Sequence, residues 1–122
     1  MSVLRTLTLT LIAAGAATIA AAQPVVTNGL LTDAAGLTLY TFDNDATTPG
    51  KSACINACLS MWTPLFAPAG AKAQGDHALI TRDDGRLQWT YKGRPLYRWY
   101  DDKKPGDMGG DGLRQVWHVA RP

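Results

Sequence analysis

One ten-residue pattern occurs twice in this chain of 122 residues. Residues Gly36–Asp45 (GLTLYTFDND) and Gly93–Asp102 (GRPLYRWYDD) share the pattern G-x-x-L-Y-x-aromatic-x-x-D. Two copies are too few for a solenoid, which needs at least three stacked repeats. The duplication therefore predicts one small domain whose two halves share a core, with repeat 1 at about 24–66 and repeat 2 at about 77–122.

Each copy of the pattern is predicted to be a strand that runs into a loop. Side chains alternate between the two faces of a strand, so Tyr40 and Phe42 should share one face, as should Tyr97 and Trp99. Turn residues separate further segments with the character of strands. These segments are Val25–Thr32, Leu79–Arg82, Leu87–Tyr91 and Gln115–Ala120. The expected fold class is mainly β, built from antiparallel hairpins.

Composition supports a β-rich chain with many turns. Every acidic residue is Asp, and the sequence contains 12 Gly and 7 Pro. Asp, Gly and Pro favour turns, whereas the absent Glu favours helix interiors. One short helix is expected between the repeats, at about 52–62, because Ser52 is a suitable N-cap. Within it, Ile55, Leu59 and Trp62 recur at helical spacing.

The first 22 residues predict a cleaved signal peptide. A single charge, Arg5, precedes an apolar run, and the segment ends in three alanines of the kind that a signal peptidase accepts. The alternative, a membrane anchor, needs about 20 apolar residues. Cleavage after Ala22 would leave Gln23 first, where a lipoprotein carries Cys. We therefore expect a periplasmic or secreted domain, residues 23–122, with no membrane anchor.

Cys54 and Cys58 are the two cysteines of the chain. In an oxidising compartment they are expected to form a disulfide. The enclosed loop is short, so the stabilisation is only about 2 kcal/mol and serves to hold a local turn. The alternative is a metal or redox pair, but the usual C-x-x-C and C-x-x-C-H motifs are absent.

The paired Tyr-x-(Phe/Trp)-x-x-Asp motifs resemble a bacterial family called the secreted repeat of unknown function. The resemblance places the family's motif on Tyr40, Phe42, Asp45, Tyr97, Trp99 and Asp102. It continues through Pro49–Cys54, Trp62–Leu65, Thr81–Gly85, Gln88–Tyr97, Lys104–Asp107 and Val116–Val119. The resemblance implies an exported domain of two repeats without an established activity. Many members are lipoproteins, but this chain lacks the cysteine that would carry the lipid.

The charge balance limits the classes of partner. Twelve Lys and Arg residues face 10 acidic residues, which argues against nucleic acid or an anionic membrane surface as the partner. Basic residues do gather among the aromatic residues of repeat 2. They form either a patch for an anionic ligand or an ordinary solvated face, and they are Lys92, Arg94, Arg98, Lys103 and Lys104.

Asp-rich loops follow both copies of the motif. Carboxylate oxygens are the ligands that Ca²⁺ and other hard divalent cations prefer, so these loops are the candidate metal site. The candidate ligands are Asp43, Asp45, Asp102, Asp107 and Asp111. The alternative is that these carboxylates accept backbone N–H bonds in turns. No cofactor other than such a metal is expected.

Catalytic signals are weak. The chain has no G-x-S-x-G nucleophile elbow, and a structural role is favoured for its two histidines, His77 and His118. A glycosidase-like pair would have to consist of two Asp residues, such as Asp43 with Asp102.

Aromatic residues crowd repeat 2. The motif aromatics are expected in the core, because both repeats place such a pair on one face. Trp89 and Tyr100 are expected to be exposed, where they could form a platform for sugars or for a protein partner.

The leading functional hypothesis is a non-enzymatic, exported binding or interaction module whose site is the Asp-rich loops. Its partner would be a small ligand or another envelope protein. The alternatives are a small envelope hydrolase that uses paired Asp carboxylates and a purely structural envelope protein.

Overall fold

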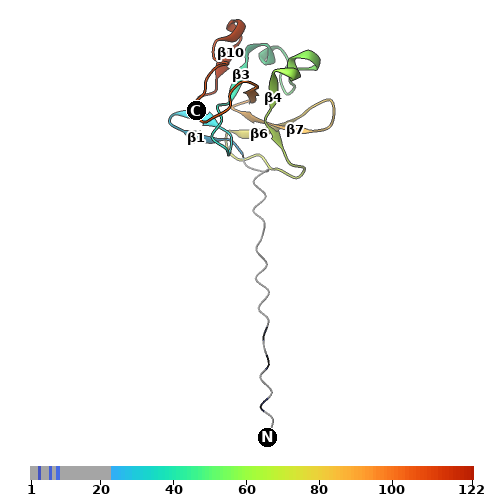
Figure 1. Ribbon diagram of the computed structural model, residues 1–122. Coiled ribbons are helices and arrows are strands. Elements are labelled where there is room, and N and C mark those ends of the chain that lie inside the picture. Colours follow the sequence, from blue (N-terminus) through green and yellow to red (C-terminus); the bar gives the residue numbers. More distant parts are fainter. Residues whose placement is uncertain (1–2, 4–5, 7, 9–22) are drawn as a thin grey trace.

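The computed structural model describes residues 3, 6, 8 and 23–122 (Figure 1). The predicted signal peptide, residues 1–22, lies outside the described residues apart from those three positions. Within the described residues, no helix has the length and apolar character needed to cross a membrane.

Residues 23–122 form short strands that all pair in an antiparallel manner, so the predicted mainly β fold class is confirmed. The strands are β1 (Val25–Thr27), β2 (Leu30–Thr32), β3 (Tyr40–Phe42), β4 (Trp62–Pro64), β5 (Phe66–Ala67), β6 (His77–Thr81), β7 (Leu87–Tyr91), β8 (Arg94–Pro95), β9 (Tyr97–Trp99) and β10 (Trp117–Val119). Three turns of 3-10 helix complete this part of the chain: η2 (Asp43–Thr47), η3 (Asn56–Ser60) and η4 (Leu113–Gln115).

The segment Val25–Thr32 is a hairpin, and its prediction as one strand is wrong. β1 and β2 pair across a two-residue turn at Asn28 and Gly29, whose φ angles are 51° and 77°. Asn-Gly is the strongest short signal for such a turn, because both residues tolerate positive φ. The dipeptide Asn28-Gly29 is therefore a local signal for a turn, and it outweighs the strand character of the apolar residues on either side.

The predicted helix at about 52–62 is also wrong, since the structure has only the 3-10 turn η3 there. Ile55 is extended, and Asn56 has a left-handed φ of 54°, which a right-handed helix cannot accommodate. As a result Ile55 and Leu59 are 48% and 37% exposed, while Trp62 starts strand β4 in the core.

The two motif strands are neighbours in the sheet β10-β3-β9-β4. β3 and β9 run antiparallel, with Tyr40 directly opposite Tyr97. The two outer strands are arranged in the same way. Each places a tryptophan opposite the second aromatic residue of a motif, with Trp117 of β10 opposite Phe42 and Trp62 of β4 opposite Trp99. The two repeats are thus related by an approximate two-fold axis that passes between the two tyrosines.

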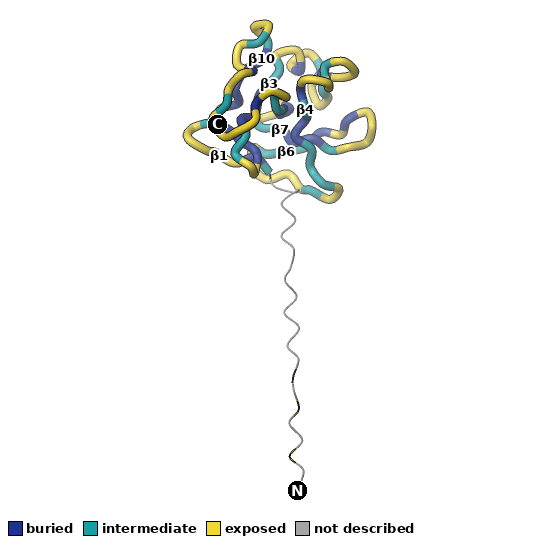
Figure 2. The backbone as a smooth tube through the Cα atoms, in the orientation of Figure 1, coloured by how far each residue is buried: buried dark blue, intermediate teal, exposed yellow. Residues whose placement is uncertain are grey.

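Adjacent residues of each motif enter two different cores. Leu39 and Leu96 pack in an aliphatic core, whereas Tyr40 and Tyr97 pack in an aromatic core on the other side of the sheet. Within the aromatic core Trp62 and Trp117 stack at 3.7 Å between ring centroids. Figure 2 shows this buried centre in dark blue, surrounded by exposed loops.

A second sheet, β5-β7-β6, with β8 also paired to β7, completes the aliphatic core. In Figure 1 β6 and β7 lie below β3. Trp89 of β7 is only 3% exposed, so the prediction that it is exposed is wrong, because its side chain packs in the aliphatic core. Tyr100, at 53%, is exposed as predicted.

Candidate functional site

The motif tyrosines and aspartates bind one another across the two repeats. The hydroxyl of Tyr40 donates to Oδ2 of Asp102 at 2.5 Å, and the hydroxyl of Tyr97 donates to Oδ2 of Asp45 at 2.7 Å. Each tyrosine therefore binds the aspartate of the other repeat. This exchange follows from the antiparallel pairing of β3 with β9, and it explains why Tyr and Asp recur together in both copies.

The second oxygen of each motif aspartate holds the loop that follows it. Oδ1 of Asp45 accepts the backbone N–H of Ala53 at 2.6 Å, and Oδ1 of Asp102 accepts that of Gly109 at 3.0 Å. Asp45 is 6% exposed and Asp102 is 7% exposed. These contacts are those of carboxylates that organise loops from inside the protein.

Burial determines the protonation of this network. Loss of solvent raises the pKa of Tyr40 well above its ordinary value, as does its bond to Asp102. Burial also raises the pKa of Tyr97, and the negative charge of Asp45 raises it further. Burial also raises the pKa of Asp45, against the lowering effect of the Ala53 N–H, the Tyr97 hydroxyl and the Arg82 charge. Both tyrosines therefore remain hydrogen-bond donors at neutral pH.

The other predicted metal ligands have separate partners. Asp43 pairs with the ring Nε2 of His118 at 2.9 Å, with both side chains exposed. Asp107 accepts two backbone N–H bonds within its own turn, and Asp111 accepts the N–H of Val119. Among the described residues, no three His, Cys, Asp or Glu side chains are grouped to hold a metal ion. Divalent-metal binding by Asp43, Asp45, Asp102, Asp107 and Asp111 stays a prediction.

The paired-aspartate hydrolase also stays a hypothesis. Asp102 is buried against Tyr40, whereas the suggested partner Asp43 is exposed beside His118. The two carboxylates thus occupy different surroundings.

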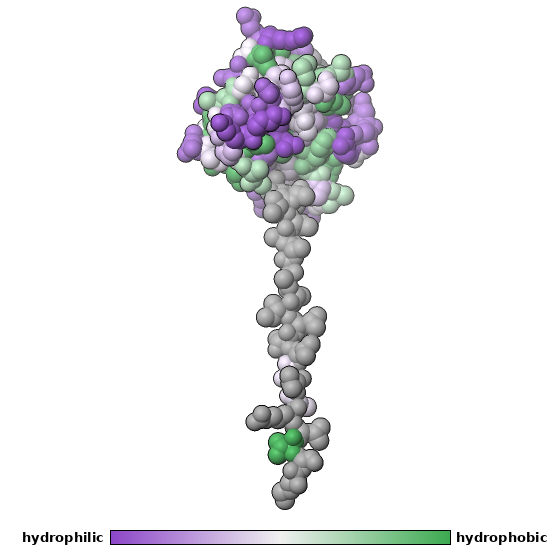
Figure 3. Space-filling view, in the orientation of Figure 1, coloured by the Kyte–Doolittle hydropathy of each residue, from purple (hydrophilic) through white to green (hydrophobic). Residues whose placement is uncertain are grey.

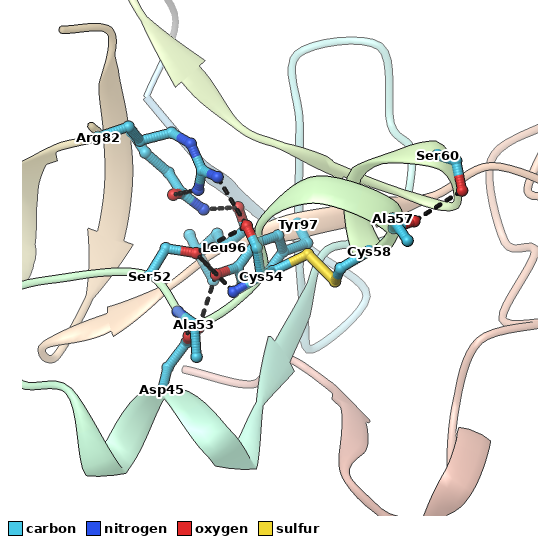
Figure 4. The surroundings of a disulfide bond; sticks show 11 residues. Asp45, Ser52, Ala53, Cys54, Ala57, Cys58, Ser60, Arg82, Leu96 and Tyr97 are labelled. Atoms are coloured by element: carbon cyan, nitrogen blue, oxygen red, sulfur yellow. Dashed lines mark hydrogen bonds between the residues drawn. A yellow bond between two sulfur atoms is a disulfide. The ribbon is translucent and has the colours of Figure 1, made fainter. Parts of the chain in front are cut away.

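The disulfide between Cys54 and Cys58 is confirmed. The guanidinium of Arg82 donates to the backbone oxygen of Cys54 at 2.7 Å and to Oε1 of Gln88 at 2.8 Å. Figure 4 shows Arg82 directed toward Cys54 beside the disulfide. The hydroxyl of Ser52 lies 2.6 Å from that of Tyr97. The disulfide turn is therefore attached to repeat 2 at two points, at Tyr97 of β9 and at Arg82 in the turn between β6 and β7. Nothing local in the sequence signals the burial of a single arginine, so this role of Arg82 is visible only in the structure.

A concave region of about 420 Å³, here called the basic pocket, lies where β3, β10 and the β7–β8 turn meet. Lys92, Arg94, Arg121 and His118 are among its lining residues, and no acidic residue lines it, although His118 pairs with Asp43 beside it. Figure 3 shows hydrophilic side chains over the centre of one face, beside the C-terminal end marked in Figure 1. The pocket thus combines two residues of the predicted basic group, Lys92 and Arg94, with Arg121 from near the C-terminus.

A tight turn presents the basic residues of the pocket. Lys92 and Gly93 both have positive φ, 48° and 80°, so that Tyr91 and Arg94 lie opposite each other in the hairpin. The ammonium of Lys92 lies 5.4 Å from the centre of the Tyr91 ring, within cation–π range. A left-handed conformation costs a lysine about 1 kcal/mol. This strained residue therefore lies at the rim of the pocket.

The other predicted basic residues have neighbours outside the pocket. Arg98 pairs with Asp33 at 3.5 Å, and the ammonium of Lys103 donates to the backbone oxygen of Tyr100. In contrast, within the part of the chain that the structure describes, Lys92, Arg94 and Arg121 form no ion pair.

Comparison with known proteins supports the reading of the duplicated motif. A family model described as the secreted repeat of unknown function matches residues 26–65 and 78–121. No curated protein and no solved structure matches the chain. Each matched segment contains one copy of the Tyr–Asp motif, and together they span more than half of the chain. The chain therefore belongs to the family of the secreted repeat of unknown function.

Proposed function

We propose that this protein is an exported, non-enzymatic binding module that takes a small anionic ligand in the basic pocket. The observation that carries the proposal is that Lys92, Arg94 and Arg121 line one concave surface that has no acidic residue in its lining. Export through cleavage after Ala22, into the periplasm or the medium, is part of the proposal. It agrees with the description of the family as secreted.

Electrostatics supports an anion at this position. Lys92, Arg94 and Arg121 line one concave surface and form no ion pair among the described residues, and like charges repel one another, so their grouping adds nothing to the stability of the fold. An anion between them would remove that repulsion and would accept charge-assisted hydrogen bonds, which are stronger than neutral ones. The planar guanidinium groups of Arg94 and Arg121 suit carboxylate, phosphate or sulfate in particular.

The lining of the pocket is suited to a small organic anion. Tyr91, which is partly exposed, also lines the pocket beside the charged residues, and a less polar surface strengthens nearby electrostatic attraction. A volume of about 420 Å³ lies within the usual range for sites that take small molecules. The Asp-rich loops are not part of this proposal, because buried hydrogen bonds already engage Asp45 and Asp102. An envelope protein as the partner stays a prediction.

Titration of the exported protein with phosphate, sulfate and citrate, followed by amide NMR, tests the proposal. We expect saturable shifts around Lys92, Arg94 and Arg121 with at least one of these anions, weakening as NaCl screens the charges. The double variant Lys92→Met, Arg121→Met should lower the affinity about tenfold or more. The matched control Lys104→Met, also an exposed lysine, should leave it unchanged. Absence of a saturable shift with all three anions would overturn the proposal.

A further inference from the structure

We propose a second binding site, the cleft between the disulfide turn and the β6–β7 turn, for a small aliphatic zwitterion such as a free aliphatic amino acid or dipeptide. This disulfide cleft has a volume of about 370 Å³. One wall is the segment from Lys51 to Leu59, and the other is the turn from Thr81 to Asp84. None of these residues lines the basic pocket, so the inference is independent of the proposed function.

Both walls of the disulfide cleft are held in place before any ligand arrives. The Cys54–Cys58 bond closes one wall, and the buried guanidinium of Arg82 connects it to the other through the backbone oxygen of Cys54 (Figure 4). Gln88 fixes the same guanidinium from the β7 side. A site with fixed walls loses little conformational freedom on binding, which favours small ligands.

Two aliphatic side chains are exposed on the wall formed by the disulfide turn. Ile55 and Leu59 both line the cleft, and the turn η3, which follows Ile55 and contains Leu59, buries none of its residues. Their exposure follows from the left-handed Asn56, which prevents the helix that would have turned them inward. Covering such side chains with an aliphatic group removes apolar surface from water and favours binding.

Opposite charges lie on the two walls. Lys51 belongs to the disulfide wall and Asp83 to the hairpin wall, and neither forms an ion pair in the part of the chain that the structure describes. The neighbouring Asp84 differs, because Arg86 holds its carboxylate at 2.8 Å. Arg82 differs as well, since it is buried and its two terminal nitrogens donate to Gln88 and to the backbone oxygen of Cys54. One cation and one anion therefore remain available to a ligand.

This pattern is complementary to a molecule with three features. A carboxylate would bind Lys51, an ammonium group would bind Asp83, and an aliphatic side chain would pack on Ile55 and Leu59. A simple anion gains little here, because Asp83 and Asp84 offset the positive charges in the lining. A purely apolar ligand would remove water from Lys51 and Asp83 without replacing their hydrogen bonds, which is unfavourable. The balance of charges is what distinguishes the disulfide cleft from the basic pocket.

Amide and methyl NMR titration of the exported protein with leucine and with leucyl-leucine tests this inference. At least one of them should give saturable shifts at Ile55 and Leu59. For the ligand that binds, amidation of the carboxylate or replacement of the amino group by hydrogen should weaken binding about tenfold or more. Glycine, which keeps both charges but has no aliphatic side chain, should also bind less tightly.

Two single variants test the contributions of Lys51 and Asp83 to binding one at a time. Lys51→Met and Asp83→Asn should each lower the affinity about tenfold or more, while circular dichroism confirms an unchanged fold. The matched controls Lys72→Met and Asp76→Asn, at other exposed positions, should have no effect. The basic-pocket variant Lys92→Met, Arg121→Met should bind leucine normally, so failure of one proposal is distinguishable from failure of the other. The inference is overturned if neither leucine nor leucyl-leucine gives saturable shifts, or if Lys51→Met and Asp83→Asn bind as tightly as the parent protein.

Discussion

After β3 in repeat 1 and after β9 in repeat 2, the chain forms a loop that donates a backbone N–H to the motif aspartate of the same repeat. In repeat 1 that loop continues into the turn closed by Cys54–Cys58. In repeat 2 it contains Gly109 and Gly110, and the N–H of Gly110 also reaches the hydroxyl of Tyr40 at 3.3 Å. The same Tyr–Asp bond is therefore supported by a covalent link in one repeat and by close backbone packing in the other.

This difference shows what the two repeats share and where they differ. Each Tyr–Asp bond joins a tyrosine of one repeat to an aspartate of the other, so both bonds need both copies of the motif. The loops that support the bonds are different in the two repeats. They are not equivalent, and the disulfide cleft lies beside the loop of repeat 1, where the turn leaves Ile55 and Leu59 exposed.

The largest effect is expected when both Tyr–Asp bonds are broken. In the double variant Tyr40→Phe, Tyr97→Phe, two buried carboxylates lose a hydroxyl donor, at a cost of about 2 kcal/mol each. Urea unfolding should show a loss of about 4 kcal/mol for the pair. Tyr100→Phe, on the surface, is the control and should change stability little. A double variant as stable as the parent protein would refute the structural role of the motif.

Gly110→Ala tests the close packing of repeat 2. A Cβ at this position would lie 2.6 Å from the Trp62 ring and 3.1 Å from the Trp99 side chain. We expect a loss of about 3 kcal/mol in thermal or urea unfolding, because the stacked indoles cannot move aside freely. Gly109→Ala is the matched control, since its nearest contact is 3.2 Å from an Asp102 oxygen, and it should cost clearly less. Equal costs at the two glycines would contradict this account.

Removal of the disulfide tests the covalent support of repeat 1. The double variant Cys54→Ala, Cys58→Ala should lose about 2 kcal/mol, as expected for closing so short a loop. Hydrogen exchange should increase between Ser52 and Met61, whereas the amides of Gly109 and Gly110 should stay protected. An equal loss of protection in both loops would show that the two supports are not independent.

Alkaline pH should weaken both repeats together. The pKa of Tyr40 and of Tyr97 is raised by folding, so their contribution to stability is complete below about pH 10. It is lost as the pH rises above that value, by up to about 1.4 kcal/mol per pH unit for each tyrosine, because the unfolded chain releases the proton first. Urea unfolding at pH 9, 10 and 11 measures the slope. Tyr40→Phe or Tyr97→Phe should each halve it, and an unchanged slope in both would contradict the assignment.

Much of the fold followed from local patterns. Alternating apolar residues and turn residues identified the segments that form β6, β7 and β10, and the repeat predicted that two halves would share a core. The disulfide followed from two nearby cysteines in a chain whose first residues predict export. The Asn28-Gly29 turn was equally local, yet the apolar residues on either side of it suggested a continuous strand.

Other features depend on what lies next to a residue in space. Helical spacing over 52–62 was overridden by the left-handed Asn56 and by the short disulfide. Trp89 is buried because its face of the sheet packs against Leu31 and Leu39, which are distant in the sequence. The basic pocket needs Lys92 from one hairpin and Arg121 from the end of the chain, which no sequence window contains together.

The sequence by itself determined that this protein is a β-rich, duplicated domain with a Tyr–Asp motif in each half and one disulfide. These properties depend on the period of apolar residues, on turn chemistry and on identical spacing, all of which are local. Only the tertiary structure decided that each tyrosine binds the aspartate of the other repeat. A carboxylate accepts whichever donor the fold brings to it, and here antiparallel pairing of β3 with β9 brings the hydroxyl from the other half.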